Sequence, residues 1–209
     1  MDDRKMIQEM IYDTEESIKF FSSAKKPDRE RSACAAFLRS LNIKFNANDL
    51  QSIEDDPPDV IFDKAKFEVK EYLDDDRRRH AEFKQRLDKL RQAQKLSDLL
   101  QPYRPFNITM RDVSGRLSPF LEDYAKSYGR TLCSSLDVLV YFNLTDCHVE
   151  GDNVDPDNSR LLKQGWRSVS MITNSFAYIF FAQDSAPEFL IANSGIIKKA
   201  PVISGLFDI

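Results

Sequence analysis

Several features that mark whole classes of protein are scarce in this sequence. Its three cysteines, Cys34, Cys133 and Cys147, are odd in number and have no C-x-x-C spacing, so neither a disulfide framework nor a zinc knuckle is indicated. Its two histidines, His80 and His148, are too few for a histidine-rich metal site. Any catalytic metal is therefore expected to have oxygen ligands, as Mg²⁺ or Mn²⁺ does.

Long apolar runs and a dominant charge are missing as well. No stretch approaches the ~18 consecutive apolar residues of a membrane span, and no apolar run follows a basic N-terminus. We therefore expect a cytoplasmic protein with no membrane partner. The 30 Lys and Arg against 34 Asp and Glu give a net charge of -4, which by itself argues neither for nor against nucleic acid. A Gly-rich phosphate loop and a G-x-S-x-G motif are also missing, so nucleotide-binding and serine-hydrolase functions lack support.

The sequence does contain enough apolar residues for one substantial core, since 42% of its 209 residues are hydrophobic. We predict a single domain over residues 1–209, with an amphipathic helix at residues 2–22 as an appendage. Helix and strand patterns are mixed along the chain, and the apolar run 136–144 is typical of a strand covered on both faces. The predicted fold class is α/β, with a mixed central sheet flanked by helices.

Two of the predicted helices have recognisable ends. Ser118 is the expected N-cap of one of them, with Pro119 at its first position and Gly129 just past its end. For the other helix, Asp75 or Asp76 is the expected cap, and the helical pattern extends to about residue 100.

The segment PPDVIFDKAKFEVKEYL, residues 57–73, places charges on two otherwise apolar strands. If residues 63–64 form the turn of a hairpin, the numbers of facing residues sum to 127 and Asp59 lies opposite Glu68. Lys70 follows Glu68 by two positions and projects from the same face. A bulge in either strand would shift this register.

Two facing carboxylates repel each other, and a divalent cation between them would convert that cost into binding energy. A neighbouring ammonium group could stabilise charge on a reacting phosphate or assist in deprotonating a water. The alternative interpretation is a solvated strand face that carries ordinary charges. The residues alone leave both interpretations open.

These residues resemble a known nuclease signature. Pro58-Asp59 followed by Glu68-Val69-Lys70 is similar to the PD-(D/E)xK motif, on the strand–turn–strand unit where that superfamily carries it. The resemblance implies a restriction-endonuclease-like core. The superfamily often supplies a further glutamate from the preceding helix, and Glu30 is the matching residue here. The resemblance therefore implies Asp59, Glu68 and Lys70 as catalytic residues, and Asp59, Glu68 and Glu30 as ligands of Mg²⁺ or Mn²⁺.

A narrower resemblance covers most of the chain. It is to one bacterial family of unknown function, numbered seventeen-eighty, whose members are described as endonucleases. The segments that carry it are RERSACAAFLRSLN, PPDVIFDKAKFEVKEYLD, RRRHAEFK, QGWRSVSMI and FAYIFFAQDSAPEFL. The implied function is metal-dependent hydrolysis of nucleic acid. The alternative is a nuclease-fold protein without catalysis that binds nucleic acid or a protein partner. The oligomeric state is not indicated.

The third predicted helix suggests where nucleic acid binds. Between residues 77 and 95 there are eight Lys or Arg against two acids. Arg77, Lys84 and Arg91 are seven apart and form a stripe, and together with Arg78 they are the candidate contacts to a phosphate backbone. A solvated helix face explains the same residues.

Three further residues have open roles. Trp166 and Arg167 are compatible with a stacking or phosphate contact, and also with an exposed hairpin start or a core tryptophan. His80 is either a substrate-facing acid or a partly buried structural histidine. The pair Tyr124 and Tyr128, four residues apart, is predicted to belong to the core.

Overall fold

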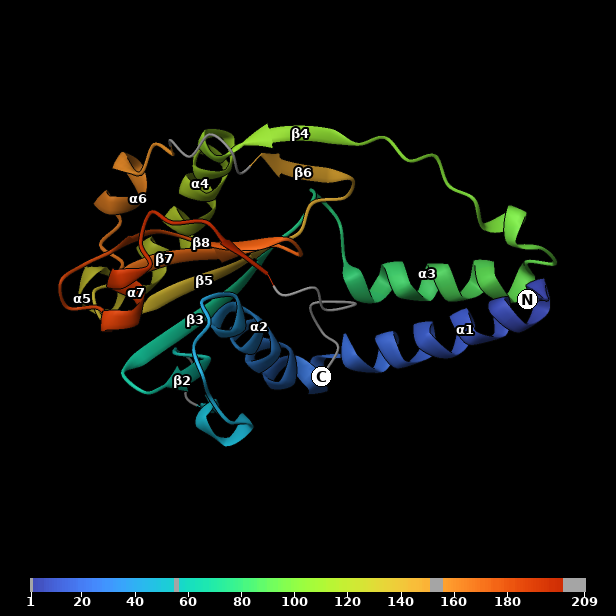
Figure 1. Ribbon diagram of the computed structural model, residues 1–209, viewed down its shortest axis with the longest axis horizontal. Coiled ribbons are helices and arrows are strands. Elements are labelled where there is room, and N and C mark those ends of the chain that lie inside the picture. The colour runs from blue at the N-terminus through green and yellow to red at the C-terminus, as the bar shows by residue number, and fades with distance from the viewer. Residues whose placement is uncertain (1, 55–56, 151–155, 201–209) are drawn as a thin grey trace. The chain divides into compact units, whose positions relative to one another are not determined.

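The computed structural model describes residues 2–54, 57–150 and 156–200 (Figure 1). Contacts along the chain separate two compact units. One comprises Met1–Arg29 with Asp74–Arg104, and the other comprises Glu30–Leu73 with Pro105–Ile209. The single domain with residues 2–22 as an appendage stays a prediction, and the N-terminal helix belongs to the first unit together with residues 74–104. None of the helices in the described ranges is both long enough and apolar enough to cross a membrane.

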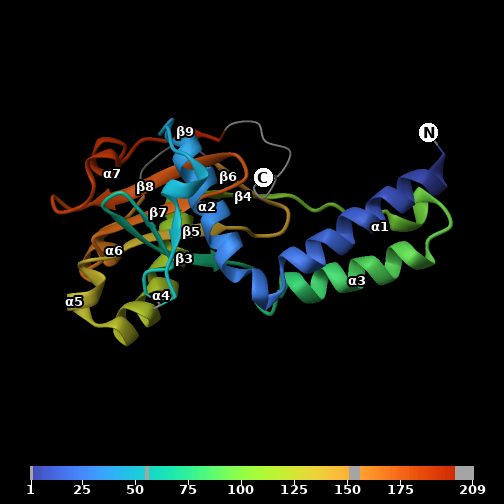
Figure 2. The same ribbon diagram turned by 90° about the horizontal axis from the view of Figure 1, so that it is seen from below.

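The first unit is a pair of helices. Its elements are α1 (Asp3–Phe20), the 3-10 turns Ser23–Lys25 and Leu96–Leu99, and α3 (Arg79–Gln92). Figure 2 shows α1 and α3 side by side, and the rings of Phe21 and Phe83 stack at 5.1 Å. The predicted cap of the third helix is wrong, because Arg78 occupies the N-cap position and Asp76 has a positive φ of 63°. Helix α3 also ends at Gln92 rather than near residue 100.

The second unit is built on a mixed sheet with the strand order β1-β2-β3-β5-β7-β8-β9. The pairs β3–β5 and β5–β7 are parallel, and the other neighbours are antiparallel. A separate parallel pair consists of β4 and β6. The strands are β1 (Gln51–Ser52), β2 (Val60–Phe62), β3 (Ala65–Tyr72), β4 (Phe106–Thr109), β5 (Asp137–Phe142), β6 (Cys147–Glu150), β7 (Ser168–Ile172), β8 (Phe176–Ala182) and β9 (Lys198–Lys199).

Strand β5 lies at the centre of this sheet, between two parallel neighbours, and every one of its residues is buried. This confirms the prediction for the apolar run. The predicted mixed α/β architecture is confirmed as well. The remaining helical elements are α2 (Lys26–Ser40), the 3-10 turn Ala47–Asp49, α4 (Met110–Tyr128), α5 (Arg130–Cys133), α6 (Ser159–Lys163) and α7 (Glu188–Ala192).

Helices α2 and α4 cover opposite faces of the sheet (Figure 1). On one face Phe37 of α2 meets Phe67 of β3, with ring centroids 5.9 Å apart. On the other face the apolar residues of α4 pack with Val138 and Val140 of β5. Successive residues of a strand point to opposite faces, so the position after Phe67 projects toward α4.

The predicted start of the helix at Ser118 is wrong. Helix α4 begins at Met110, where Thr109 caps it and exchanges hydrogen bonds with Asp112. Pro119 therefore lies inside the helix. The capping box supplied a stronger start than the proline, and packing of the preceding turns into the core extends the helix. Its predicted end is confirmed, because Gly129 follows it with a φ of 75°.

Candidate active site

The hairpin that carries the candidate site has the predicted register. Val60 pairs with Phe67 and Phe62 with Ala65, so the numbers of facing residues sum to 127. Asp59 departs from this ladder, however. Its backbone N–H donates to the carbonyl of Phe67 at 3.0 Å, although Val60 is already the partner of Phe67. One extra residue opposite a single partner is the arrangement of a β-bulge, so Asp59 does not face Glu68 directly within the ladder.

The Asp59 carboxylate is held at the point where the ladder between β2 and β3 ends. Its Oδ2 accepts a hydrogen bond from the backbone N–H of Val69 at 2.8 Å, and the side chain is only 3% exposed. The carboxylate therefore takes the place of a backbone carbonyl as the acceptor for the N–H of Val69, which fixes the position of Asp59.

Glu68 is fully buried, and its two carboxylate oxygens have different surroundings. Oε1 forms an ion pair with Nζ of Lys70 and accepts a hydrogen bond from the hydroxyl of Tyr128 at 2.6 Å. Oε2 is buried, and it has no hydrogen-bond partner among the described residues. A buried carboxylate oxygen without a donor is costly, and an oxygen of this kind is suited to bind a hard cation.

The electrostatics of Glu68 agree with that interpretation. Burial raises the pKa of Glu68, the hydrogen bonds from Lys70 and Tyr128 lower it, and the charge of Asp59 raises it again, with a net upward shift. The effect of Asp59 shows that the two carboxylates are close enough to repel. A cation placed between them would favour the ionised form of Glu68.

Lys70 is held over an aromatic ring from another part of the chain. Its Nζ lies 4.9 Å from the ring centroid of Tyr124 on α4. The tyrosines Tyr124 and Tyr128 were predicted to belong to the core, and that prediction missed their contacts with charged groups. Their i, i+4 spacing shows that they share one face of a helix. That this face contacts Lys70 depends on the tertiary fold, in which α4 lies in the connection between the parallel strands β3 and β5.

Glu30 is buried on α2, the helix that covers the opposite face of the sheet. Burial raises the pKa of Cys34 on the same helix, and the charges of Asp59 and then Glu30 raise it further. Within the described ranges, His, Cys, Asp and Glu form no group of three that could hold a metal ion. Glu30 as a third ligand therefore stays a prediction without geometric support.

The candidate nucleic-acid contacts lie in the first unit and do not form one helical stripe. Arg77 precedes α3, and its guanidinium binds Glu82 at 2.9 Å and Asp74 at 3.6 Å. Arg91 forms an ion pair with Glu15 at 2.8 Å. Arg78 and Lys84 are exposed at the N-cap and on the helix. Two of the four cations are therefore engaged with carboxylates, and the role of the set stays a prediction.

Trp166 and Arg167 are structural. Trp166 is fully buried and its indole N–H donates to Oε1 of Gln164 at 3.0 Å, which confirms the interpretation as a core tryptophan. Arg167 forms a two-point ion pair with the buried carboxylate of Asp137 at the start of β5. It also donates to the carbonyl of Lys64 at 3.1 Å. His80, in the first turn of α3, is half-buried.

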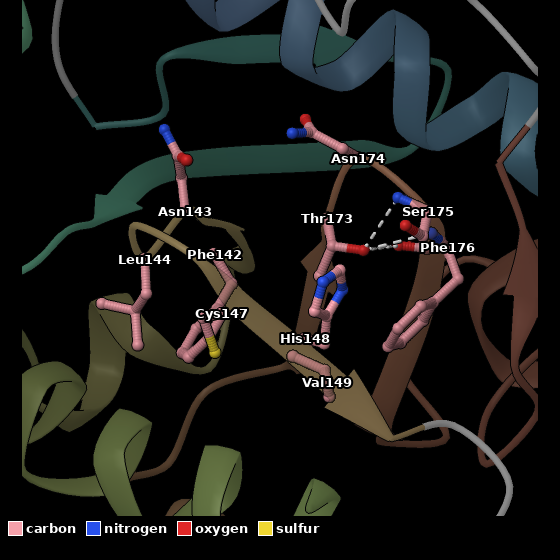
Figure 3. Close-up of a pocket in the computed structure, with 10 residues that line it drawn as sticks. All are labelled: Phe142, Asn143, Leu144, Cys147, His148, Val149, Thr173, Asn174, Ser175 and Phe176. Atoms are coloured by element: carbon pink, nitrogen blue, oxygen red, sulfur yellow. Dashed lines mark hydrogen bonds between the residues drawn. The ribbon is translucent and has the colours of Figure 1, made fainter. Parts of the chain in front are cut away.

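A cavity of about 210 Å³ lies at the carboxyl ends of β5 and β7 (Figure 3). The hydroxyl of Thr173 accepts hydrogen bonds from the backbone N–H groups of Ser175 and Phe176, which fixes the hairpin at its rim. Glu68 pairs with Val138, four residues before the end of β5, so the cavity lies beyond the carboxylates. The lining residues are Phe142, Asn143, Leu144, Cys147, His148, Val149, Thr173, Asn174, Ser175 and Phe176.

Comparison with known proteins gives two matches. A family model described as "Putative endonuclease, protein of unknown function (DUF1780)" matches residues 2–201. A solved structure of a protein of unknown function from Pseudomonas aeruginosa strain PAO1, described as a member of the monooxygenase superfamily, is 31% identical with a TM-score of 0.68. That match covers 99% of each chain, so the fold is shared nearly from end to end. No curated protein matches the sequence.

Proposed function

The chain belongs to the DUF1780 family, whose description is that of an endonuclease, and we propose that it is a metal-dependent endonuclease that hydrolyses phosphodiester bonds of nucleic acid. The observation that carries this proposal is the state of Glu68. One of its oxygens is held by Lys70 and Tyr128, and the other is buried and finds no donor among the described residues. The charge of Asp59 also acts on this carboxylate. The proposed fold assignment is a restriction-endonuclease-like core, supported by the strand–turn–strand unit that carries these residues.

The residues present fit a hard cation. Mg²⁺ is usually bound through one or two carboxylates, with waters and substrate phosphates completing its shell, so a group of three acids is not required. Oε2 of Glu68 and the carboxylate of Asp59 are the proposed ligands of Mg²⁺ or Mn²⁺. The N–H and C=O of one strand residue point to the same side, so the carbonyl of Val69 faces the Asp59 edge and is a further candidate. When bound, the ion would polarise a phosphoryl oxygen and lower the pKa of a bound water.

Lys70 supplies the positive charge at this site. Its ammonium contacts Glu68 and lies over the ring of Tyr124, which fixes the position of the charge. A lysine held in this way can stabilise negative charge that develops on the phosphate, or position the attacking water. Tyr128 keeps the Glu68 side chain in one orientation, which leaves Oε2 directed away from its two donors.

A cleavage assay tests the proposal. Purified wild-type protein should cut DNA or RNA in the presence of Mg²⁺ or Mn²⁺, and EDTA should stop the reaction. Lys70→Ala removes one charge-stabilising group and should lower the rate by about 10²- to 10³-fold. Glu68→Ala should be inactive, while circular dichroism shows both variants folded. Equal cleavage by the wild type and both variants would identify a contaminating nuclease and overturn the proposal.

The Pseudomonas aeruginosa structure is described as a member of the monooxygenase superfamily. Testing whether the reaction needs oxygen distinguishes hydrolysis from an oxygenase reaction. Phosphodiester hydrolysis consumes water and no oxidant, so strict exclusion of oxygen should leave the cleavage rate unchanged. A reaction on nucleic acid that stops without oxygen, or that needs an added reductant, would contradict hydrolysis.

A second candidate function is a nuclease-fold protein that binds nucleic acid or a protein partner without turnover. The position of Glu30 on the opposite face and the small number of acids around Glu68 favour it. It predicts binding with no cleavage under any metal condition. It also predicts that Lys70→Ala leaves the affinity for nucleic acid nearly unchanged.

A further inference from the structure

A basic pocket of about 430 Å³ lies where α4, α5 and α6 meet. Four of its lining side chains are cations and one is a carboxylate, an excess of three positive charges in a chain whose net charge is -4. The charge distribution in this pocket is therefore opposite to that of the chain as a whole. The lining residues are Glu122, Ala125, Lys126, Arg130, Arg160, Lys163 and Gln164, which we call the basic pocket.

The carboxylate of the basic pocket does not neutralise all of these cations. Glu122 is shared, at 3.2 Å from Nζ of Lys126 and 4.0 Å from Nη2 of Arg160. Arg130 and Lys163 have no carboxylate within ion-pair distance in the described part of the chain. Lys126 and Arg160 are both more than 60% exposed, so an incoming anion can reach them. The pocket therefore has charge available for a ligand.

The position of Arg130 is fixed by the backbone next to it. Gly165 has a φ of +86°, and a Cβ at that residue would lie 3.1 Å from Cγ of Arg130. A Cβ there would force the stem of the arginine to shift by a few tenths of an ångström, and the positive φ favours glycine as well. Gln164 joins the same region to α4, because its side chain donates to the carbonyl of Ser118 at 2.7 Å. Two of the pocket's residues, Arg130 and Gln164, are therefore held by neighbouring parts of the chain.

Helix α4 links the basic pocket to the candidate active site. Tyr128 binds Glu68, while Ala125 and Lys126, less than one helical turn earlier, line the pocket. One turn of helix rises only about 5.4 Å, so the two features lie at the same level along the helix. Both features are therefore carried by the C-terminal end of α4.

We propose that the basic pocket binds phosphate groups of a nucleic-acid backbone and positions the strand for cleavage. This inference rests on the proposed endonuclease function and adds the surface that holds the substrate. Contacts of this kind are independent of base sequence and sensitive to salt, because each neutralised phosphate releases counterions. Arg130 and Lys163 supply charges that form no ion pair in the described part of the chain, although the charge of Lys163 is felt by the carboxylate of Asp157.

The test is fluorescence anisotropy with a labelled DNA duplex and a labelled single strand, in EDTA and over a range of salt concentrations. The double variant Arg130→Ala, Lys163→Ala is compared with Lys44→Ala, Arg116→Ala, which removes one exposed lysine and one exposed arginine outside the pocket. We expect binding to be roughly tenfold weaker for the pocket variant. The slope of the logarithm of the binding constant against the logarithm of the salt concentration should be smaller by about two, one for each lost charge. The control variant should match the wild type.

Equal affinities and equal salt slopes for the two double variants would overturn the proposal. Displacement of the DNA by a mononucleotide as effectively as by unlabelled DNA would overturn it too, since the site would then hold a small anion. The measurement needs no turnover, so failure of the pocket proposal is distinct from failure of the nuclease proposal. Protein that binds DNA through the pocket but never cuts it would support the pocket proposal and exclude the nuclease proposal.

Discussion

The hydroxyl of Tyr128 donates a hydrogen bond to Oε1 of Glu68 at 2.6 Å, joining α4 to the middle of β3. The two residues are sixty positions apart in the sequence. Lys70 contacts the same oxygen, and the other carboxylate oxygen has no donor in the part of the chain that the structure describes. The tyrosine therefore determines which atom of Glu68 is available for a cation.

Removing that hydroxyl should destabilise the protein measurably. We expect Tyr128→Phe to lower the free energy of unfolding by about 1–2 kcal/mol, since a hydrogen bond to a buried charged group is lost. Urea unfolding measures this difference. Tyr124→Phe is the matched control, because Tyr124 contacts Lys70 through its ring, and its change should stay within about 0.5 kcal/mol. Equal losses for both variants would contradict the assigned role of the Tyr128 hydroxyl.

The pH dependence of stability should reveal the raised pKa of Glu68. Burial, together with the charge of Asp59, raises this pKa above its usual 4.5, so the folded protein favours the protonated carboxyl. The stability that Glu68 contributes is complete below the usual value and is lost as the pH rises through the folded pKa. Relative to Glu68→Gln, the wild type should therefore become less stable with rising pH.

Urea unfolding of the wild type and Glu68→Gln, without metal and from about pH 4 to about pH 8, measures this effect. The difference in free energy between the two proteins should change in the acidic range and level off at higher pH. A difference that moves the other way would mean that the folded state stabilises the ionised carboxylate. In that case Oε2 has a partner, and the account of Glu68 fails.

Much of the hairpin could be predicted from the sequence because its determinants are local. Strand alternation and a two-residue turn at residues 63–64 sufficed for the register. The extra residue at Asp59 could not be predicted, since it depends on how the chain approaches the sheet after Pro58. Tyr128 does pack against the core, as predicted, but the contact of its hydroxyl with Glu68 could not be predicted, for a similar reason. Its polar end meets a strand that only the tertiary fold brings near.

Arg167 should prove to be a stability residue rather than a phosphate contact. Arg167→Ala leaves the buried carboxylate of Asp137 without its ion pair, which should cost about 3–5 kcal/mol. Adding Asp137→Asn should recover part of the loss, because the uncompensated charge is removed. Urea unfolding gives both values. An Arg167→Ala protein of normal stability with a reduced salt dependence of DNA binding would support the phosphate contact instead.

Metal binding should depend on Asp59 and Glu68 and not on Glu30. At about ten times its Kd, Mn²⁺ should raise the Tm of the wild type by about 3–5 °C. Asp59→Asn and Glu68→Gln should abolish the shift. Glu30→Gln should retain it, because Glu30 lies on the helix that covers the opposite face. Loss of the shift in Glu30→Gln would restore Glu30 as the third ligand that the sequence resemblance implies.

The basic residues of the pocket could not be identified from the sequence. Clustering along the chain drew attention to Arg77 and Arg91, but the structure pairs both with carboxylates. The cations of the basic pocket are spread over α4, α5 and α6. No local pattern marks them, because three separate turns of the chain bring them together.

The central claim is that Asp59 and Oε2 of Glu68 hold a divalent cation beside Lys70. Anomalous diffraction from crystals soaked in Mn²⁺ tests it most directly. The account predicts a peak at carboxylate–metal distance, about 2.0–2.2 Å, from both side chains. Well-ordered carboxylates with no peak between them, at a Mn²⁺ concentration that stabilises the protein, would contradict it.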